Sequence, residues 1–140
     1  MLVSTKGRYA LRVMIDLAEH NDDTFIPLKD VAARQEISEK YLESIISVLS
    51  KARLVMGMRG KGGGYKLTKA PKDYTVGSIL KLADGSLAPI ACLEIPENQC
   101  QRSSYCKTLP MWSRLNQRID DFFEAISLED LVRGTLPPGV

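Results

Sequence analysis

The chain has 140 residues, 44% of them hydrophobic and 26% charged, which suits one ordinary hydrophobic core with one appended element. It contains no run of about 18 apolar residues that could span a bilayer, and Lys6, Arg8 and Arg12 interrupt the stretch in which a secretory signal needs its apolar core. These features exclude integral membrane proteins and secreted proteins from the candidate classes, and we expect a cytoplasmic protein without a membrane partner.

Charge is distributed unevenly along the chain, although the formal net charge is only +2. Residues 1–70 hold 12 Lys and Arg against 8 Asp and Glu, a net of +4, whereas residues 71–140 hold 7 against 9, a net of −2. Residues 51–72 include seven basic side chains and no acidic one. Such a block is expected both in a solvated surface loop and in a segment that binds a polyanion. The elements predicted on either side of the block decide between these two interpretations.

Residues 4–52 have the hydrophobic periodicity of three helices. The first begins with Ser4 or Thr5 as its N-cap, and its apolar face holds Tyr9, Ala10, Val13, Met14 and Leu17. The second is short, with Leu28, Val31 and Ala32 on one face. After a tight turn, Ser38 is placed to cap a third helix, whose buried stripe is Leu42, Ile45, Ile46 and Leu49. Two short helices joined by about three residues predict a helix-turn-helix, in which the second helix contacts DNA.

The segment RLVMGMRGKGGGYKLT, residues 53–68, predicts a two-stranded hairpin with a glycine-rich tip. Arg59, Lys61 and the bare backbone around Gly62 could approach phosphates closely, as the wing beside a helix-turn-helix does. A phosphate-binding P-loop is excluded because the GxxxxGK[ST] spacing is absent and a strand, not a helix, follows the glycines.

Two further helices are predicted in the second half of the chain. A short one is capped by Thr75 and stopped at Asp84 and Gly85. The other extends from about Met111 to Ile126, and its seam has the 3, 4, 3, 4 spacing of a coiled coil, with members Trp112, Leu115, Ile119, Phe122 and Ile126. This seam could pack on its own domain or on a second copy. We favour a homodimer, since a small helix-turn-helix protein gains specificity from two half-sites.

The expected fold is mainly α with a small β-hairpin wing. Its parts are a winged helix-turn-helix domain in residues 1–83, a cysteine-bearing sensor loop in 84–107, a dimerisation helix and C-terminal return in 108–133, and a flexible tail in 134–140.

All three cysteines, Cys92, Cys100 and Cys106, lie within fifteen residues of a polar loop. An odd, clustered set in a reducing compartment favours metal ligands or redox sensors over structural bridges. Iron–sulfur ligation, zinc binding and thiol–disulfide sensing all need such thiolates, and the residues alone leave the choice among them open. An enzyme or electron carrier is disfavoured, because no constellation of His, Asp and Ser is apparent and the basic winged segment would have no purpose.

Four segments, STKGRYALR, ISEKYLESIISVLSKARLV, RGKGGGYKL and ISLEDLV, resemble the IscR/NsrR/CymR-type regulators of the Rrf2 family, which are bacterial winged-helix transcription regulators. The resemblance covers nearly the whole chain and implies a homodimer on a pseudo-palindromic operator in duplex DNA. It implies that the wing, with Arg59, Lys61 and Gly62, reaches the minor groove. It also implies that the recognition helix contacts the major groove through Ser38, Lys40, Tyr41, Glu43 and Ser44.

Cluster-bearing members of that family hold a [2Fe-2S] or [4Fe-4S] iron–sulfur cluster through three cysteines before the dimer helix, positions that Cys92, Cys100 and Cys106 match. Relatives usually have five residues between successive cysteines, whereas here there are seven and then five. The positions that supply a fourth ligand in relatives hold Leu109 and Arg8, which do not bind iron. The resemblance implies a regulator that senses cluster status, redox state or nitric oxide. The alternatives are a cluster-free regulator of cysteine or sulfur metabolism and a thiol-based switch.

Overall fold

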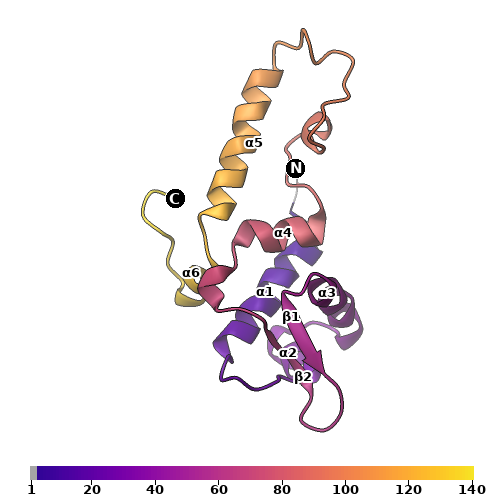
Figure 1. The fold of residues 1–140 in the computed structure, drawn as a ribbon, viewed down its shortest axis with the longest axis vertical. Helices are drawn as coiled ribbons and strands as arrows, with labels where there is room; N and C mark the ends of the chain where they lie inside the picture. The colour runs from indigo at the N-terminus through magenta and orange to yellow at the C-terminus, as the bar shows by residue number, and fades with distance from the viewer. Residues whose placement is uncertain (1–2) are drawn as a thin grey trace.

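The computed structural model describes residues 3–140, and its regular secondary structure is helical apart from one antiparallel hairpin, as predicted. The elements in chain order are α1 (Thr5–Glu19), α2 (Leu28–Gln35), α3 (Glu39–Lys51), β1 (Val55–Met58), β2 (Gly64–Leu67), η1 (Pro71–Asp73), α4 (Val76–Asp84), η2 (Ala91–Leu93), α5 (Leu109–Glu124) and α6 (Leu128–Arg133). Figure 1 shows α1 to α4, α6 and the hairpin gathered into one body, from which α5 extends. No helix of residues 3–140 is long and apolar enough to cross a membrane.

The predicted N-caps are present, and they explain where three helices begin. Ser4, Ser38 and Thr75 each accept a hydrogen bond from the backbone N–H three residues later, at 2.9, 3.2 and 3.0 Å. Such a cap satisfies an N–H group that has no partner within the helix. Gly85, with a φ of 82°, ends α4 where the sequence predicted.

The predicted apolar stripes form the main core. Val13 of α1 and Leu42 of α3 are fully buried there, together with Leu67 of the hairpin. Leu128 of α6 belongs to the same core, so the C-terminal return completes the domain that the N-terminal helices begin. A second, smaller core forms where α4 faces α5, and its buried members are Val76, Leu80, Leu87 and Ile126.

The hairpin is fixed to the body at both of its edges. Tyr74 is buried, and its hydroxyl accepts from the N–H groups of Thr68 and Lys69, both at 3.0 Å, while donating to the carbonyl of Leu54 at 2.7 Å. On the other side, Ile26 and Tyr65 exchange two backbone hydrogen bonds of 2.9 Å. These contacts hold the base of the hairpin, so its direction relative to α3 is set by the core.

Gly64 is required at the point where β2 passes residue 26. Its φ is 152°, and a Cβ built on it would lie 2.1 Å from the carbonyl oxygen of Ile26. Any side chain would therefore push the hairpin away from the body.

Helix α5 differs at its C-terminal end from the predicted helix. It was expected to reach Ile126, but α5 stops at Glu124 and Ile126 is buried in the second core, 3% exposed. The reason is local: Ser127 and Asp130 form a capping box that starts α6, and the carbonyl of Ile126 accepts from the Val76 N–H of α4 at 2.8 Å. Ile126 is therefore removed from the predicted dimer seam.

Candidate nucleic-acid interface

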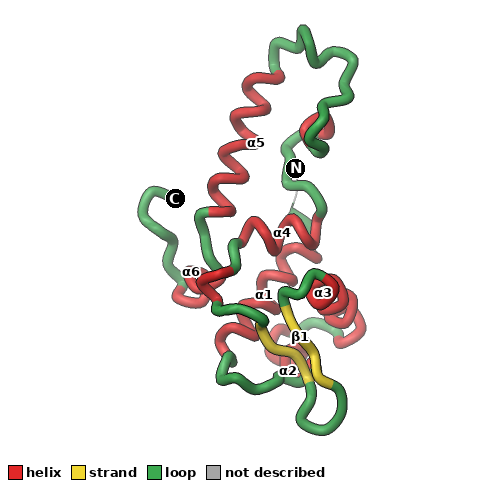
Figure 2. Tube along the Cα trace, viewed as in Figure 1, coloured by secondary structure: helices red, strands yellow, loops and turns green. Residues whose placement is uncertain are grey.

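The elements predicted to contact DNA lie at one end of the molecule. In Figure 2, α2, α3 and the hairpin are at the end opposite to the far tip of α5. The turn between α2 and α3 is tight because Glu36 takes a left-handed conformation, with a φ of 55°. Burial of the stripe of α3 leaves the opposite face of that helix in solvent, as a helix that enters a groove requires.

Four of the five predicted recognition residues are exposed: Ser38, Lys40, Glu43 and Ser44. The hydroxyls of both serines already make hydrogen bonds within their own helix. Ser38 caps α3, and the Ser44 hydroxyl donates to the carbonyl of Tyr41 at 2.6 Å. Lys40 and Glu43 make no ion pair within residues 3–140, so their charged ends are available to a ligand.

Tyr41 is held differently from the other four. It is half-buried, with its ring edge-to-face against that of Tyr9 at 5.9 Å between centroids. The Arg12 guanidinium lies 4.8 Å from the centre of the Tyr9 ring, and its Nε donates to Gln35 at 3.2 Å. The structure thus places an aromatic and cationic stack from α1 against the recognition helix, and the edge-to-face contact restrains the Tyr41 ring.

Sequence reasoning did not place Tyr9 and Arg12 against the predicted recognition helix. Tyr9 was assigned to the apolar face of its helix, and Arg12 was noted only as a charge that interrupts a signal sequence. The spacing Tyr9 to Arg12 was the available signal, because residues three apart share one helix face.

A buried carboxylate joins the first two helices. Asp16 is 1% exposed, and its oxygens accept from Arg34 at 2.8 and 3.0 Å and from Gln35 at 2.9 Å. Burial alone would raise the pKa of Asp16, but the hydrogen bonds from Arg34 and Gln35 and the positive charge of Arg34 hold the pKa below its ordinary value. The carboxylate therefore stays ionised and fixes α2, the first helix of the helix-turn-helix, against α1.

The tip of the hairpin presents the other predicted contacts. Arg59, Lys61 and Gly62 are all exposed, and Gly60 and Gly62 have φ values of 90° and 76°, with open space around the position of a Cβ. Not every cation of the basic block reaches this tip. Lys66 turns back to Asp23 at 3.2 Å and lies 4.8 Å from the centre of the Phe25 ring.

The cysteines lie far from this surface: Cys92 is in η2, and Cys100 and Cys106 are in the loop between η2 and α5. Cys92 and Cys106 are half-buried, Cys100 is exposed, and all three thiols are free. Thr108 lowers the pKa of the Cys106 thiol through a contact of 3.4 Å between Sγ and Oγ1 and through its backbone, with a smaller contribution from the charge of Arg102.

The residue types in this loop fit an iron–sulfur cluster, but their arrangement does not. Accessible thiols, one with a lowered pKa, are the ligands that iron–sulfur clusters require. Within residues 3–140, however, no three side chains of His, Cys, Asp or Glu come together as a metal site. The predicted ligand set is therefore dispersed in this conformation of the loop.

Comparisons with known proteins agree with this geometry. Residues 3–134 match the sequence profile of the Rrf2 family, described as an iron-dependent transcriptional regulator. The chain is 40% identical over 133 residues to the HTH-type transcriptional regulator IscR of Photobacterium profundum, a match that covers 95% of this chain and 76% of the relative.

Two solved structures extend the similarity to the whole fold. The chain resembles CymR, the global cysteine regulator of B. subtilis, with a TM-score of 0.77 and 32% identity over 96% of this chain and 98% of that one. It resembles IscR of T. potens with a TM-score of 0.74 and 34% identity over 96% and 88%. These proteins are regulators rather than enzymes, and they confirm the predicted winged helix-turn-helix fold.

Proposed function

The chain belongs to the Rrf2 family of transcriptional regulators, and from that premise we propose that it is a sequence-specific DNA-binding homodimer that binds a pseudo-palindromic operator. Rrf2 regulators bind DNA. The observation that carries the proposal is the shared location of an exposed face of α3 and a cationic, glycine-rich hairpin tip at one end of the molecule. A protein with this task works beside the chromosome, in the cytoplasm.

The proposed contacts of each group of residues with DNA follow from the chemistry of their side chains. Lys40 and Glu43 suit base edges in the major groove, where a lysine donates to guanine and a carboxylate accepts from the cytosine amino group. Ser38, Tyr41 and Ser44 offer hydroxyls beside them. Arg59 and Lys61 suit the minor groove and the phosphates, and the open backbone at Gly62 lets the tip approach closely.

The dimer is proposed to form through α5. None of its residues is buried within this chain, and Met111, Leu115 and Phe122 are 55%, 40% and 43% exposed. A row of large apolar side chains at helical spacing is typical of an interface rather than of a solvated surface. Pairing two copies through α5 would present two recognition helices to two half-sites.

Cys92, Cys100 and Cys106 are proposed as the sensor, with iron–sulfur ligation as the first candidate chemistry. The three accessible thiols and the name IscR among the relatives favour it, and the loop would have to close to gather them. A thiol-based switch in a cluster-free regulator of cysteine metabolism is the second candidate. It is favoured by the lowered pKa of the Cys106 thiol and by the similarity to a global cysteine regulator.

Selection from a random duplex library tests the proposed function. We expect enrichment of one motif with two inverted half-sites, and binding to it that is about 10³-fold or more tighter than to unrelated DNA at the same salt concentration. Absence of any enriched motif from purified, folded protein would contradict sequence-specific binding. Anaerobic reconstitution with iron and sulfide, followed by visible absorbance, distinguishes the two sensor chemistries.

A further inference from the structure

The helix proposed to form the dimer is attached to the DNA-binding body at one end only. Ile119 and Phe123 of α5 pack on the second core, whereas the first half of α5 extends away from the body in Figure 1. A helix of 16 residues is about 24 Å long. The angle at this single attachment therefore decides where a dimer places its two DNA-binding bodies.

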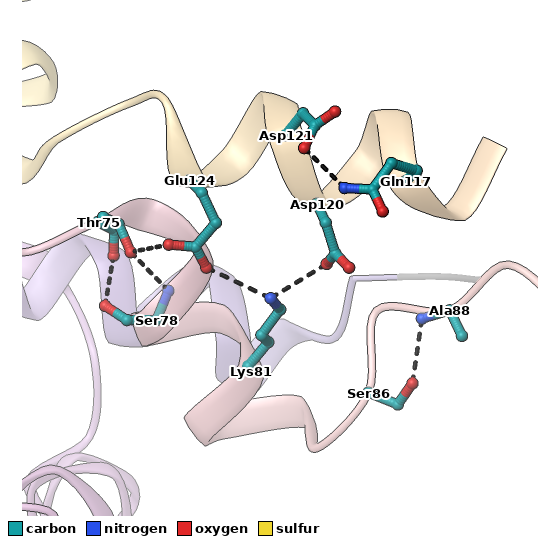
Figure 3. Close-up of polar contacts among 9 residues, drawn as sticks. All are labelled: Thr75, Ser78, Lys81, Ser86, Ala88, Gln117, Asp120, Asp121 and Glu124. Atoms are coloured by element: carbon teal, nitrogen blue, oxygen red, sulfur yellow. Dashed lines mark hydrogen bonds and ion pairs between the residues drawn. The ribbon is translucent and has the colours of Figure 1, made fainter. Parts of the chain in front are cut away.

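Packing of apolar side chains favours particular helix crossing angles but leaves a scatter of about 15–20°. One lysine on α4 adds directional contacts, because its ammonium group lies between two carboxylates of α5. Lys81 Nζ is 3.1 Å from Asp120 and 3.3 Å from Glu124 (Figure 3). Asp120 and Glu124 are four residues apart and share one face of α5.

Glu124 is bound at a second point on α4. Its other oxygen accepts from the hydroxyl of Thr75 at 2.8 Å, the same hydroxyl that caps α4 (Figure 3). The carboxylate lies directly over Gly77, where an added Cβ would be 2.3 Å from Glu124 Oε1. Two separated points of attachment, at the N-cap of α4 and at Lys81, prevent α5 from pivoting about either one.

Helix α4 is in turn rigidly connected to the helix-turn-helix. It packs against α1 and α3. At its C-terminal end, Asp84 accepts from the backbone N–H of Ser4 at 3.1 Å and from the Ser4 hydroxyl, which joins α4 to the cap of α1. A change in the angle between α4 and α5 is therefore a change in the angle between the dimer helix and α3.

We propose that Lys81, with Asp120 and Glu124, is a positioning latch that fixes the half-site spacing accepted by the dimer. The inference rests on the proposed function, a DNA-binding dimer formed through α5. A change of about 10° at the junction moves the far end of α5 by about 4 Å, close to the roughly 3.4 Å rise of one base pair. The latch thus restrains the assembly on the scale of single base-pair steps.

The latch also faces the cysteine-bearing loop. Lys81 and Asp120 line a cavity of about 260 Å³ together with Leu93, Glu94 and Ile95, which lie next to Cys92 in the chain. Under this proposal, a rearrangement of the loop that carries Cys92 alters the surroundings of the latch and, through it, the half-site spacing.

The test uses the full chain with a Lys81→Met substitution. Without the ammonium group, Asp120 and Glu124 repel each other at four-residue spacing, and α5 loses one of its two points of attachment. Exposed ion pairs contribute little to global stability, so the variant is expected to fold and dimerise. Lys81→Arg is the matched control, because it keeps a cation between the two carboxylates.

Binding is measured to the selected operator and to duplexes whose half-sites are moved by one or two base pairs. Wild type and Lys81→Arg should lose about tenfold or more in affinity for each base pair of offset, because mis-spaced half-sites must be deformed to be reached. Lys81→Met should lose less than about threefold per base pair, with unchanged affinity for a single half-site and an unchanged salt slope. The unchanged slope would show that Lys81 does not itself contact phosphate.

A folded, dimeric Lys81→Met variant with the sharp wild-type spacing profile would overturn the latch and leave the proposed function intact. Wild-type protein that shows no operator binding, or no spacing preference, would overturn the latch together with the proposed dimeric function. Glu124→Gln provides a second variant that keeps the Asp120 contact and should broaden the profile partially.

Discussion

At the scale of single residues, the wing tip offers the most direct test of the interface. Arg59 is exposed beside Gly60 and close to Gly62, which both have positive φ values and open space around the position of a Cβ. We expect Arg59→Ala to weaken operator binding by about 1–3 kcal/mol if the guanidinium contacts a base, or to reduce the salt slope by about one if it contacts phosphate. Titration of the operator at several salt concentrations measures both quantities.

Lys66→Ala is the matched control for Arg59→Ala. This lysine belongs to the same basic block but is held by Asp23 and Phe25, away from the tip. It should change neither the affinity nor the slope. If Arg59→Ala behaved like this control, the assignment of the wing tip to DNA would be wrong.

Asp16 is a residue whose charge stabilises the interface without touching it. Asp16→Asn removes the ion pair with Arg34 inside the body and should lower the free energy of unfolding at pH 7 by about 1–3 kcal/mol. The folded-state pKa lies below the ordinary 3.8. The stabilisation is therefore fully present above the unfolded-state pKa and is lost as pH falls through the folded-state pKa.

Urea unfolding of wild type and Asp16→Asn at pH 7 and at pH 3 measures this dependence. The difference between the two proteins should be largest at pH 7 and smaller at pH 3. Glu19→Gln, an exposed change on the same helix, should stay within about 0.5 kcal/mol of wild type. A difference that grew on acidification would contradict an ionised, stabilising Asp16.

At the scale of elements, the boundaries of most helices were predictable because their signals are local. Ser4, Ser38 and Thr75 cap helices that begin one residue later, and Gly85 ends one of them. These signals need only neighbouring residues. The hairpin was predictable for the same reason, since its glycines and its flanking strands are contiguous.

The features that sequence reasoning missed depend on partners far along the chain. Ile126 continues the coiled-coil spacing, but the capping box of α6 and the backbone bond to Val76 place it in a core. Tyr41 is half-buried only because Tyr9 of another helix lies against it. The latch of Lys81 joins residues about 40 positions apart on two helices, and no local pattern indicates such a pair.

The structure shows which residues of α5 should be changed to test dimerisation, because it separates the exposed members of the apolar seam from those that pack on the core. Ile119 belongs to the predicted apolar seam, but its side chain packs on the second core. A substitution there would change the stability of the fold as well as dimerisation, and the two effects could not be separated. Leu115 and Phe122 are exposed instead. We expect Leu115→Asp with Phe122→Asp to yield folded monomers in analytical ultracentrifugation, because charges cannot be buried unpaired at an apolar interface.

Ser113→Asp is the control for these α5 variants, since it places the same charge on the opposite side of the helix. It should remain dimeric. A dimer that survived the double substitution would show that α5 is not the association surface.

At the scale of the whole molecule, the cysteine-bearing loop and the proposed DNA-binding surface are separate structures. The helix-turn-helix and wing are held by the main core and by Tyr74, and none of these contacts involves a cysteine. Loss of any metal should therefore leave DNA binding to some class of site, with a changed affinity or spacing preference. The connection between the two structures passes through α4, α5 and the latch.

The separation makes the cysteines testable one at a time. If Cys92, Cys100 and Cys106 act together as ligands, losing any one leaves iron with too few protein ligands to compete with solvent and free thiols. Each single Cys→Ser variant, purified without oxygen, should therefore lose the visible absorbance of the wild-type protein. Leu109→Ala, at the position where relatives carry a ligand, should keep it, because an aliphatic side chain donates nothing to iron.

The competing thiol switch predicts a different pattern for the same variants. It needs only a reactive thiolate and a partner, and the lowered pKa of the Cys106 thiol makes it a candidate for the reacting thiolate. Under that chemistry, wild type reconstituted anaerobically with iron and sulfide stays colourless with all three thiols titratable, and only variants of the reacting pair lose their response to oxidant. Colour in wild type that disappears in all three serine variants would exclude the switch, since a pair of thiols cannot make a third one necessary.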